Sequence, residues 1–289
     1  MSQTTLLQSH TAVVIKRAIG SALSHLALIG ASLLVGLPFF WMIATSFKSD
    51  VEVGIFPPVW FPQQLMLSNY VEVWNAAPFN LFFINSIITT FSGLILEVIV
   101  GALSAYAFAR IDFPHRDALF MVVLATMMIP GEMALVPNFI TLKQLNWINT
   151  YQGIVIPYVS SAFGCFLLRQ ALLGLSPDYF DAAKIDGAGH LRILVSIALP
   201  MVRPVVATFA LFLFIGKWNA YLWPLIVTNT WNMRTLPIGL VMVRDAEGAL
   251  LGWQHLMAAS LMVLLPVLIV FFIAQKQLIE GIARGGIKG

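Results

Sequence analysis

Long apolar runs constrain this chain more than any other feature of its sequence. A helix needs about 20 apolar residues to cross a bilayer. Six stretches are long enough, at residues 25–47, 81–108, 118–142, 153–173, 200–227 and 256–274. Only 10% of the residues are charged, whereas soluble domains carry about a quarter. The sequence therefore predicts an all-α integral membrane protein with six transmembrane helices.

Basic residues in the loops predict the orientation, because cytoplasmic loops are enriched in lysine and arginine. With the N-terminus inside, the inner segments carry Lys16, Arg17, Arg110, Arg116, Arg169, Lys184, Arg192, Arg203, Lys276, Arg284 and Lys288. The outer segments carry only Lys48, Lys143, Arg234 and Arg244. We therefore expect both termini in the cytoplasm, with an N-terminal segment over 1–24, a membrane domain over 25–274 and a tail over 275–289. The first apolar run is too long for a signal-peptide core, so we expect it to be retained.

A polar segment on the inner side begins after the fourth apolar run. Ser176 is a favourable N-cap, and Pro177 suits the first position of a helix. Gly187 readily ends a helix. The pattern predicts a short helix, a tight bend and a second helix from about Gly189.

One face of this short helix combines small and acidic side chains. Residues spaced i, i+3, i+4 and i+7 share a face, and here they are Tyr179, Ala182, Ala183 and Asp186. Two alanines beside acids let the surface of another protein approach closely. The alternative is a helix that lies on the membrane surface without a partner, which would account for Phe180 and Ile185.

The same segment resembles a known motif. It reads Asp181-Ala-Ala-Lys-Ile-Asp-Gly-Ala188, then eight residues, then Ile197-Ala-Leu-Pro200. The membrane subunits of bacterial ABC importers carry Glu-Ala-Ala-x-x-Asp-Gly-Ala, eight residues and Ile-x-Leu-Pro in a cytoplasmic loop. Every fixed position matches except the first, where Asp181 keeps the charge of glutamate. The resemblance implies that the loop 176–199 contains a coupling helix that docks on an ATPase subunit. Its coupling residues would be Tyr179, Asp181, Ala182, Ala183, Asp186, Gly187 and Ala188.

The end of the chain is similar to the Gly-x-Thr-x-Gly-Gly-x-Lys-Gly ending of the maltose-type importer subunit, with Ala283 in place of threonine. In that subunit the tail reaches between the ATPase subunits, which implies tail contacts for Gly285, Gly286 and Lys288. An ordinary reading of such a glycine-rich, basic end is a frayed, solvated terminus. The fifth apolar run also carries a Trp218-Asn219 pair like that of the family's carbohydrate branch. Together with the loop motif and this ending, the pair extends the resemblance over nearly the whole chain. It implies the type I importer permease fold of the shorter, six-span partner in a two-permease pair.

The resemblance also implies a function and an assembly. The chain would be a permease subunit forming half of the pathway for a carbohydrate, or a related polyol or glycoside, in the bacterial inner membrane. Its partners would be membrane lipid, a second homologous permease chain in a heterodimer, two ATPase subunits that hold ATP and Mg²⁺, and an extracytoplasmic substrate-binding protein. In this family the outer loops also meet the binding protein, which implies such a role for 48–80 and 229–254; the alternative for the aromatic residues of 48–80 is to anchor the chain at the membrane–water interface. No nucleic-acid partner is expected.

Polar groups at membrane depth are costly and should face protein or water. The candidates for a substrate path are Asn85, Glu132, Lys217, Trp218, Asn219, Tyr221 and Trp223. The aromatic rings with polar tips suit a sugar, although such residues also anchor helix ends at the interface. Lys217 would counter an anionic substrate such as a glycerol phosphate ester, or extend toward a polar layer. Pro130 and Gly131 should kink the third span, and Glu97 and Glu132 should pair with other helices.

Two other classes of protein fit the sequence poorly. A secondary transporter would show an internal repeat with paired broken helices, and no convincing repeat is found. An enzyme would need a catalytic constellation, but the histidines at 10, 25, 115, 190 and 255 are scattered, without metal-ligand spacing. The phosphate loop Gly-x-x-x-x-Gly-Lys-Ser/Thr is also missing from the sequence. We therefore expect a transport subunit with no catalytic residues, no metal site and no bound cofactor.

Overall fold

The structure, a computed structural model, describes the backbone of residues 3–245 and 252–286 and the side chains of residues 17, 19–242 and 252–275. The contacts divide the chain into two compact units. Unit 1 comprises Met1–Val71 and Leu250–Leu261, and unit 2 comprises Glu72–Ala249 and Met262–Gly289. The described residues form helices and loops, without a strand. This confirms the predicted all-α class.

Unit 1 contains one long apolar helix followed by a segment rich in proline and aromatic residues. Helix α1 (Gln3–Ser46) includes the predicted first span and begins well before residue 25, so the predicted lead-in continues the same helix. Next come α2 (Asp50–Gly54) and the first residues of α3 (Ser68–Ala76). Ser49 and Glu52 form a capping box at the start of α2, where each side chain accepts from the other residue's backbone N–H.

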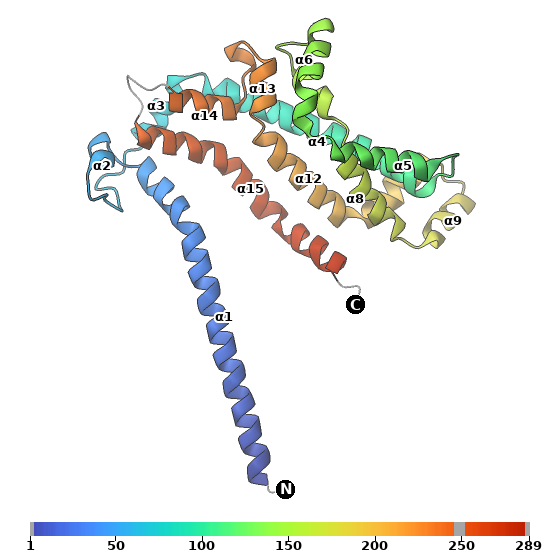
Figure 1. Cartoon of the computed structure of the whole chain (residues 1–289), viewed down its shortest axis with the longest axis horizontal. Coiled ribbons are helices and arrows are strands. Elements are labelled where there is room, and N and C mark those ends of the chain that lie inside the picture. Colours follow the sequence, from blue (N-terminus) through green and yellow to red (C-terminus); the bar gives the residue numbers. More distant parts are fainter. Residues whose placement is uncertain (1–2, 246–251, 287–289) are drawn as a thin grey trace. The chain divides into compact units, whose positions relative to one another are not determined.

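Unit 2 contains most of the helices (Figure 1). In chain order they are α4 (Phe79–Arg110), α5 (Arg116–Ala125), η1 (Thr126–Met128), η2 (Gly131–Ala134), α6 (Leu135–Gln144), α7 (Tyr151–Val155), η3 (Ile156–Tyr158), α8 (Ala162–Leu173), α9 (Pro177–Ile185), α10 (His190–Ile193), the π-helical turn η4 (Leu194–Ala198), α11 (Leu199–Met201), α12 (Arg203–Trp218), α13 (Leu222–Val227), η5 (Trp231–Met233) and α14 (Leu236–Asp245). Helix α15 (Trp253–Gly286) begins in unit 1 and ends in unit 2.

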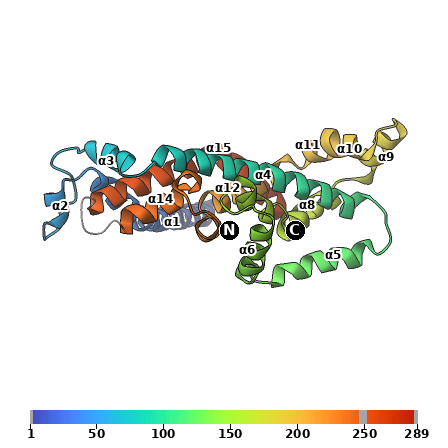
Figure 2. The ribbon, with the colours of Figure 1, turned by 90° about the horizontal axis from the view of Figure 1, so that it is seen from above.

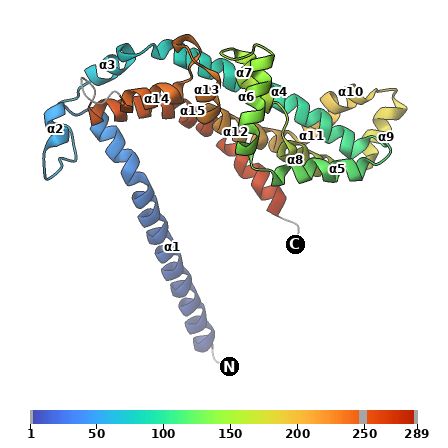
Figure 3. The same ribbon diagram turned by 45° about the horizontal axis from the view of Figure 1, so that its top comes forward.

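The apolar runs fold into straight and bent helices. Three helices in the described part are long and apolar enough to cross a membrane, and counting each of three bent pairs as one span gives up to six. The first pair consists of α5 and η1 on one side and η2 and α6 on the other. It bends by 92° at the predicted Pro130-Gly131 kink (Figure 3). Proline lacks the N–H that a continuous helix would need there. A second pair bends by 50° around residues 159–161, and a third by 86° at Val202. The predicted run 200–227 is also interrupted at residues 219–221, before α13.

Helix α4 buries its small and polar residues and exposes its large apolar ones. Its buried face includes Asn85, Ser86, Gly93, Glu97 and Ala105, whereas many of its isoleucine and leucine side chains are exposed. This distribution is expected in a bilayer, where small residues let helices pack closely and large apolar residues can face lipid. In unit 2, α4 runs from the side of α14 toward α9 (Figure 2) and packs mainly on α8 and α12.

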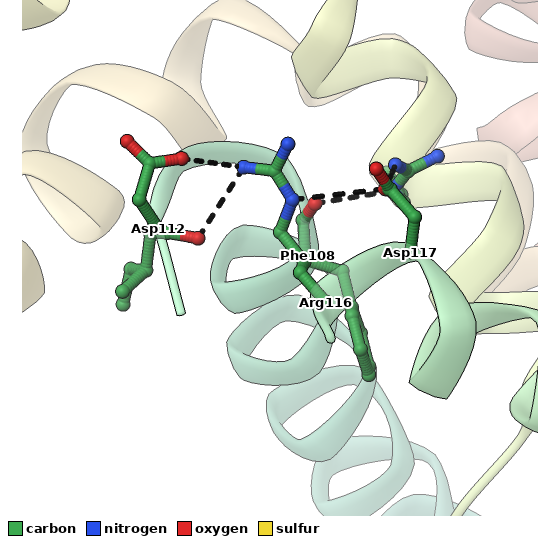
Figure 4. A network of polar contacts seen from close by, with 6 residues as sticks. Phe108, Asp112, Arg116 and Asp117 are labelled. Carbon is green, nitrogen blue, oxygen red and sulfur yellow. Dashed lines mark hydrogen bonds and ion pairs between the residues drawn. The ribbon is translucent and has the colours of Figure 1, made fainter. Parts of the chain in front are cut away.

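Charged residues tie the turn after α4 to its neighbours. Arg116 lies between Asp112, at 2.8 Å, and Asp117, at 3.7 Å, as Figure 4 shows. Arg169 on α8 also reaches Asp117 at 3.1 Å and donates to the carbonyl of Phe108 at 3.1 Å. Asp112 and Asp117 are largely exposed, so each ion pair contributes little to stability. The network orders the turn rather than holding the fold together.

The last helix continues further than predicted. Helix α15 extends through Gly286, so the first part of the predicted tail, including Gly285, is helical rather than frayed. Lys288 lies outside the described residues, as do residues 246–251 of the outer segment 229–254.

Candidate functional site

Unit 2 contains a half-open cavity of about 540 Å³ between α4, η2, the α7–α8 segment, α12 and α13. Its volume lies in the range of small-ligand pockets, about 300–1,000 Å³. Four of the predicted path residues line it: Glu132, Lys217, Tyr221 and Trp223. The structure therefore gathers residues that lie more than eighty positions apart in the sequence.

An ion pair stands in the cavity wall. Lys217 on α12 places Nζ 2.7 Å from Oε2 of Glu97 on α4, and it also donates to the carbonyl of Tyr158 at 3.2 Å. The Glu97 and Lys217 side chains are only 8% and 18% exposed. Gly93 provides the space, because a Cβ there would lie 3.1 Å from Cδ of Lys217. The predicted partner of Glu97 on another helix is thus Lys217.

Aromatic rings form another part of the wall. Trp223 is mostly buried and donates its indole N–H to the carbonyl of Gly153 at 3.2 Å. Its ring packs edge-on against Tyr158, with 5.4 Å between centroids. Tyr221 is half-buried at the start of α13 and also lines the cavity. These apolar ring faces beside a polar pair are chemically suited to a sugar, which carries C–H faces and hydroxyl groups.

Asn85, another predicted path residue, forms hydrogen bonds within the chain instead of lining the cavity. Its amide nitrogen donates to the carbonyls of Asn232 and Arg234 at 2.8 and 2.9 Å. Its oxygen accepts from the Tyr151 hydroxyl at 2.6 Å. Asn85 is buried, does not line the cavity and has its polar atoms engaged within the chain. It joins α4 to the segment before α14.

Trp218 and Asn219 also lie away from the cavity lining. Trp218 is 2% exposed, and its indole N–H donates to the carbonyl of Val263 on α15 at 3.0 Å. Asn219 ends α12, and its side chain donates back to the carbonyl of Ile215 at 2.9 Å. Helix packing and capping, rather than substrate contact, fit these two positions.

The cavity includes residues that sequence reasoning did not place on the path. Ser86, Thr89, Gly93 and Glu97 line it from one face of α4. Their spacing of three or four residues is a helical periodicity that could have marked a polar stripe in an apolar span. Ser160 and Ser161, at the break before α8, carry no comparable signal in the sequence.

The predicted loop helix on the inner side is present as α9. Ser176 is its N-cap and accepts from the backbone N–H of Asp178 at 3.3 Å, and Pro177 is the first helical residue. Asp178 lies in the first turn and Lys184 in the last, so both charges favour the helix dipole.

A Schellman motif ends α9. The N–H of Ala188 donates to the carbonyl of Ala183 and the N–H of Gly187 to that of Lys184, both at 2.9 Å. Gly187 has φ +76°, a left-handed conformation that glycine adopts without cost. Helix α10 then starts after Gly189, as predicted.

The buried side of α9 rests on the core of unit 2. Phe180 and Ala183 are 3% and 6% exposed and belong to the cluster that includes residues of α4 and α8. The guanidinium carbon of Arg110 lies 3.8 Å from the centroid of the Phe180 ring. Arg110 also donates to the carbonyls of Leu172 and Leu175, at 2.5 and 2.8 Å.

The opposite side of α9 is open in this chain. Its exposed residues from the predicted set are Tyr179, Asp181, Ala182, Asp186 and Gly187, with Ala188 half-buried. Ala183 does not belong to this exposed face, because it packs inward. In unit 2, α9 lies at one end of α4, and α13 and α14 lie toward the other end (Figures 1 and 2).

Known proteins resemble this chain over most of its length. Residues 97–284 match the family described as "Binding-protein-dependent transport system inner membrane component". The chain is 34% identical to the diacetylchitobiose uptake system permease protein NgcG of Streptomyces coelicolor, over 92% of this chain and 88% of that protein. It is 32% identical to the arabinooligosaccharides transport system permease protein AraQ of Halalkalibacterium halodurans, over 95% of this chain and 100% of the other. It is 31% identical to the sn-glycerol-3-phosphate transport system permease protein UgpE of Yersinia enterocolitica, over 89% of this chain and 94% of that protein.

A solved structure shares the fold. It is that of a bacterial ABC transporter involved in the import of the acidic polysaccharide alginate, with a TM-score of 0.81 and 24% identity over 90% of this chain and 96% of that chain. Together with the family match, it shows the type I importer permease fold. The chain belongs to the family of inner-membrane components of binding-protein-dependent transport systems.

Proposed function

We propose that this chain forms half of the membrane pathway of an ATP-driven carbohydrate importer, and that separate ATPase chains drive it through α9. The observation that carries the proposal is the construction of α9. Its two ends are capped, one side rests on the core through Phe180, and the opposite side presents Tyr179, Asp181 and Ala182 to a partner.

Arg110 connects α9 to the spans. Its guanidinium contacts the Phe180 ring on α9, while its N–H groups hold the carbonyls of Leu172 and Leu175 at the end of α8. Because Arg110 is itself the last residue of α4, a displacement of α9 would act on α4 and α8 together. Closure of the ATPase dimer on ATP would thereby switch the pathway between inward-facing and outward-facing states, which differ in their contacts.

The assembly around this chain would contain several partners. The family description names a binding protein, and a solved alginate transporter with the same fold is in complex with a periplasmic protein bound to alginate pentasaccharide. The side chains of residues 19–40 on α1 are exposed in this chain, so this surface is available to lipid or to a second permease chain. Two ATPase subunits would hold ATP and Mg²⁺ and would meet α9 and the end of the chain at Gly285, Gly286 and Lys288. That arrangement requires both termini in the cytoplasm.

A carbohydrate substrate is favoured by the cavity and by the relatives. NgcG is named for the uptake of diacetylchitobiose and AraQ for the transport of arabinooligosaccharides. The cavity of this chain offers the rings of Tyr158, Tyr221 and Trp223 and the hydroxyl group of Ser160, which is exposed. UgpE is named for sn-glycerol-3-phosphate, so a phosphate ester is the second candidate, and Lys217 is the cation in the cavity lining that would receive it.

The docking role of α9 is tested by reversing one charge. Asp181 is exposed, and its ion pair with Lys184, at 3.3 Å, is also exposed, so Asp181→Lys should cost little stability. In the assembled importer, we expect this variant to lose substrate-stimulated ATP hydrolysis while the subunit remains in the membrane. The matched control is Asp112→Lys, a charge reversal in the exposed turn after α4, which should keep normal stimulation. Normal stimulation in Asp181→Lys would refute the docking role.

A further inference from the structure

The cavity wall carries more negative than positive charges. Its charged lining residues are Glu97, Glu132 and Lys217. Lys217 is neutralised by Glu97 at 2.7 Å, and a second of its donors is used by the carbonyl of Tyr158. Among the described residues, Lys217 is the single cation of the lining, and it is already committed to a partner within the chain.

Glu132 contributes the remaining charge. It lies on η2, directly after the Pro130 kink, and it is exposed at the cavity. The prediction that Glu132 pairs with another helix is wrong: among the described residues it makes no ion pair or hydrogen bond, because it lies exposed at the cavity, whereas Glu97 is held by Lys217. With one paired and one unpaired carboxylate against one ammonium group, the described residues of the lining carry one net negative charge.

We infer that this cavity selects for neutral or cationic saccharides, such as amino sugars, and against anionic ones such as phosphate esters and uronates, with Glu132 as the residue that sets this preference. The inference rests on the proposed function, because it treats the cavity as part of the importer's pathway. It separates the two substrate candidates left open above.

Two physical effects support this selectivity. Low-dielectric walls strengthen the field of a charge inside a cleft, so Glu132 attracts cations and repels anions there. An anion could use Lys217 only by drawing it from Glu97, which would leave a carboxylate that is 8% exposed without its counter-ion. Removing one partner from such a pair is strongly unfavourable.

A thiol placed in the cavity tests the local potential directly. Cys165 is the only cysteine of the chain and is buried, so Cys165→Ala gives a cysteine-free background. Ser160→Cys adds a probe at an exposed lining position, and Gly216→Cys adds a second where a Cβ meets nothing within 4 Å. The full-length chain, in membranes, is treated with cationic, anionic and neutral methanethiosulfonate reagents. Each rate is divided by that reagent's rate with a small free thiol.

We expect the normalised rate of the cationic reagent to exceed that of the anionic reagent by a factor on the order of ten. Glu132→Gln should bring this ratio close to one while leaving the rate of the neutral reagent unchanged. Asp112→Asn removes a carboxylate outside the cavity and should leave the ratio as it was. A ratio near or below one in the parent protein would overturn the inference, and so would a ratio that survives Glu132→Gln. Failure of the neutral reagent at both probes would also overturn it, because solute would then not reach the cavity.

This experiment is independent of ATP hydrolysis and uptake. A working importer without the charge preference would refute the inference alone. A protein that shows the preference but takes up no solute with its ATPase would instead refute the proposed function.

Discussion

Glu97 and Lys217 show how single residues can place charge inside a membrane span. Each charge would be costly alone, and pairing at 2.7 Å offsets that cost while Gly93 leaves room for the lysine stem. The sequence predicts that Glu97 has a partner on another helix, but it does not identify Lys217. The two residues are 120 positions apart (217 − 97), and only the packing of α4 on α12 brings them together.

Removing one member of this pair should destabilise the protein more than removing both. Glu97→Gln leaves the Lys217 ammonium unpaired in the wall, so we expect the free energy of unfolding to fall by about 2–4 kcal/mol. The double variant Glu97→Gln with Lys217→Met should recover most of this loss. Chemical denaturation in detergent measures both. Equal losses in the single and double variants would show that the ion pair is not the reason for the instability.

Glu52, in the loop after α1, should give the protein an acid-sensitive element. The backbone N–H groups of Ser49 and Gln63 donate to its carboxylate at 2.9 and 2.6 Å and hold the pKa of Glu52 below its ordinary value of 4.5. A lowered folded-state pKa stabilises the fold above pH 4.5, and this contribution is lost as the pH falls through the folded pKa. The melting temperature should therefore drop as the pH is lowered below about 4.5. Glu52→Gln should start with a lower melting temperature and show a smaller drop, and an identical drop in both proteins would refute this role.

At the scale of elements, α9 could be predicted because its signals are local. Ser176, Pro177 and Gly187 each act on the backbone within a few residues, and the structure contains the helix and bend that they predict. The kink at Pro130 is local in the same way. The break before α8 and the inward position of Ala183 depend on neighbouring helices, which sequence spacing alone does not reveal.

The glycine that ends α9 offers a matched comparison. Gly187 has φ +76°, so Gly187→Ala should cost about 1 kcal/mol of stability. A β-branched residue there should cost more and should reduce substrate-stimulated ATP hydrolysis by disturbing α9. Gly189 lies two residues later with φ −73° and open space at its Cβ, so Gly189→Ala meets no left-handed strain and should cost less, chiefly because alanine is a weaker N-cap for α10. Equal effects at both positions, measured by thermal unfolding, would contradict the importance of the left-handed turn.

Arg110 should determine how completely motion of α9 reaches the spans. Arg110→Lys keeps the charge but loses the planar group that holds two carbonyls and covers the Phe180 ring. We expect the solute moved per ATP hydrolysed to fall roughly two- to thirtyfold, with hydrolysis itself retained. Arg192→Lys, at an exposed position on α10, is the control. If Arg110→Lys moves as much solute per ATP hydrolysed as the parent protein, Arg110 does not transmit the motion of α9.

At the scale of the whole molecule, the apolar runs predict the class and the family motif predicts the fold. Both are confirmed by the helical structure and the family match. The composition of the cavity was harder to predict, because the lining of an internal space depends on contacts between distant segments. Trp218 and Asn85 illustrate this: their chemistry suits a ligand, yet Val263, Asn232 and Arg234 already occupy their donors.

Solute uptake into reconstituted vesicles, with and without the ATPase chains, tests the central claim most directly. The vesicles contain this chain and its partner permease, and the binding protein and labelled solute are added outside. We predict uptake only when the ATPase chains and ATP are present, because the permease holds no energy source of its own. Uptake at the same rate by the membrane chains alone would contradict the account.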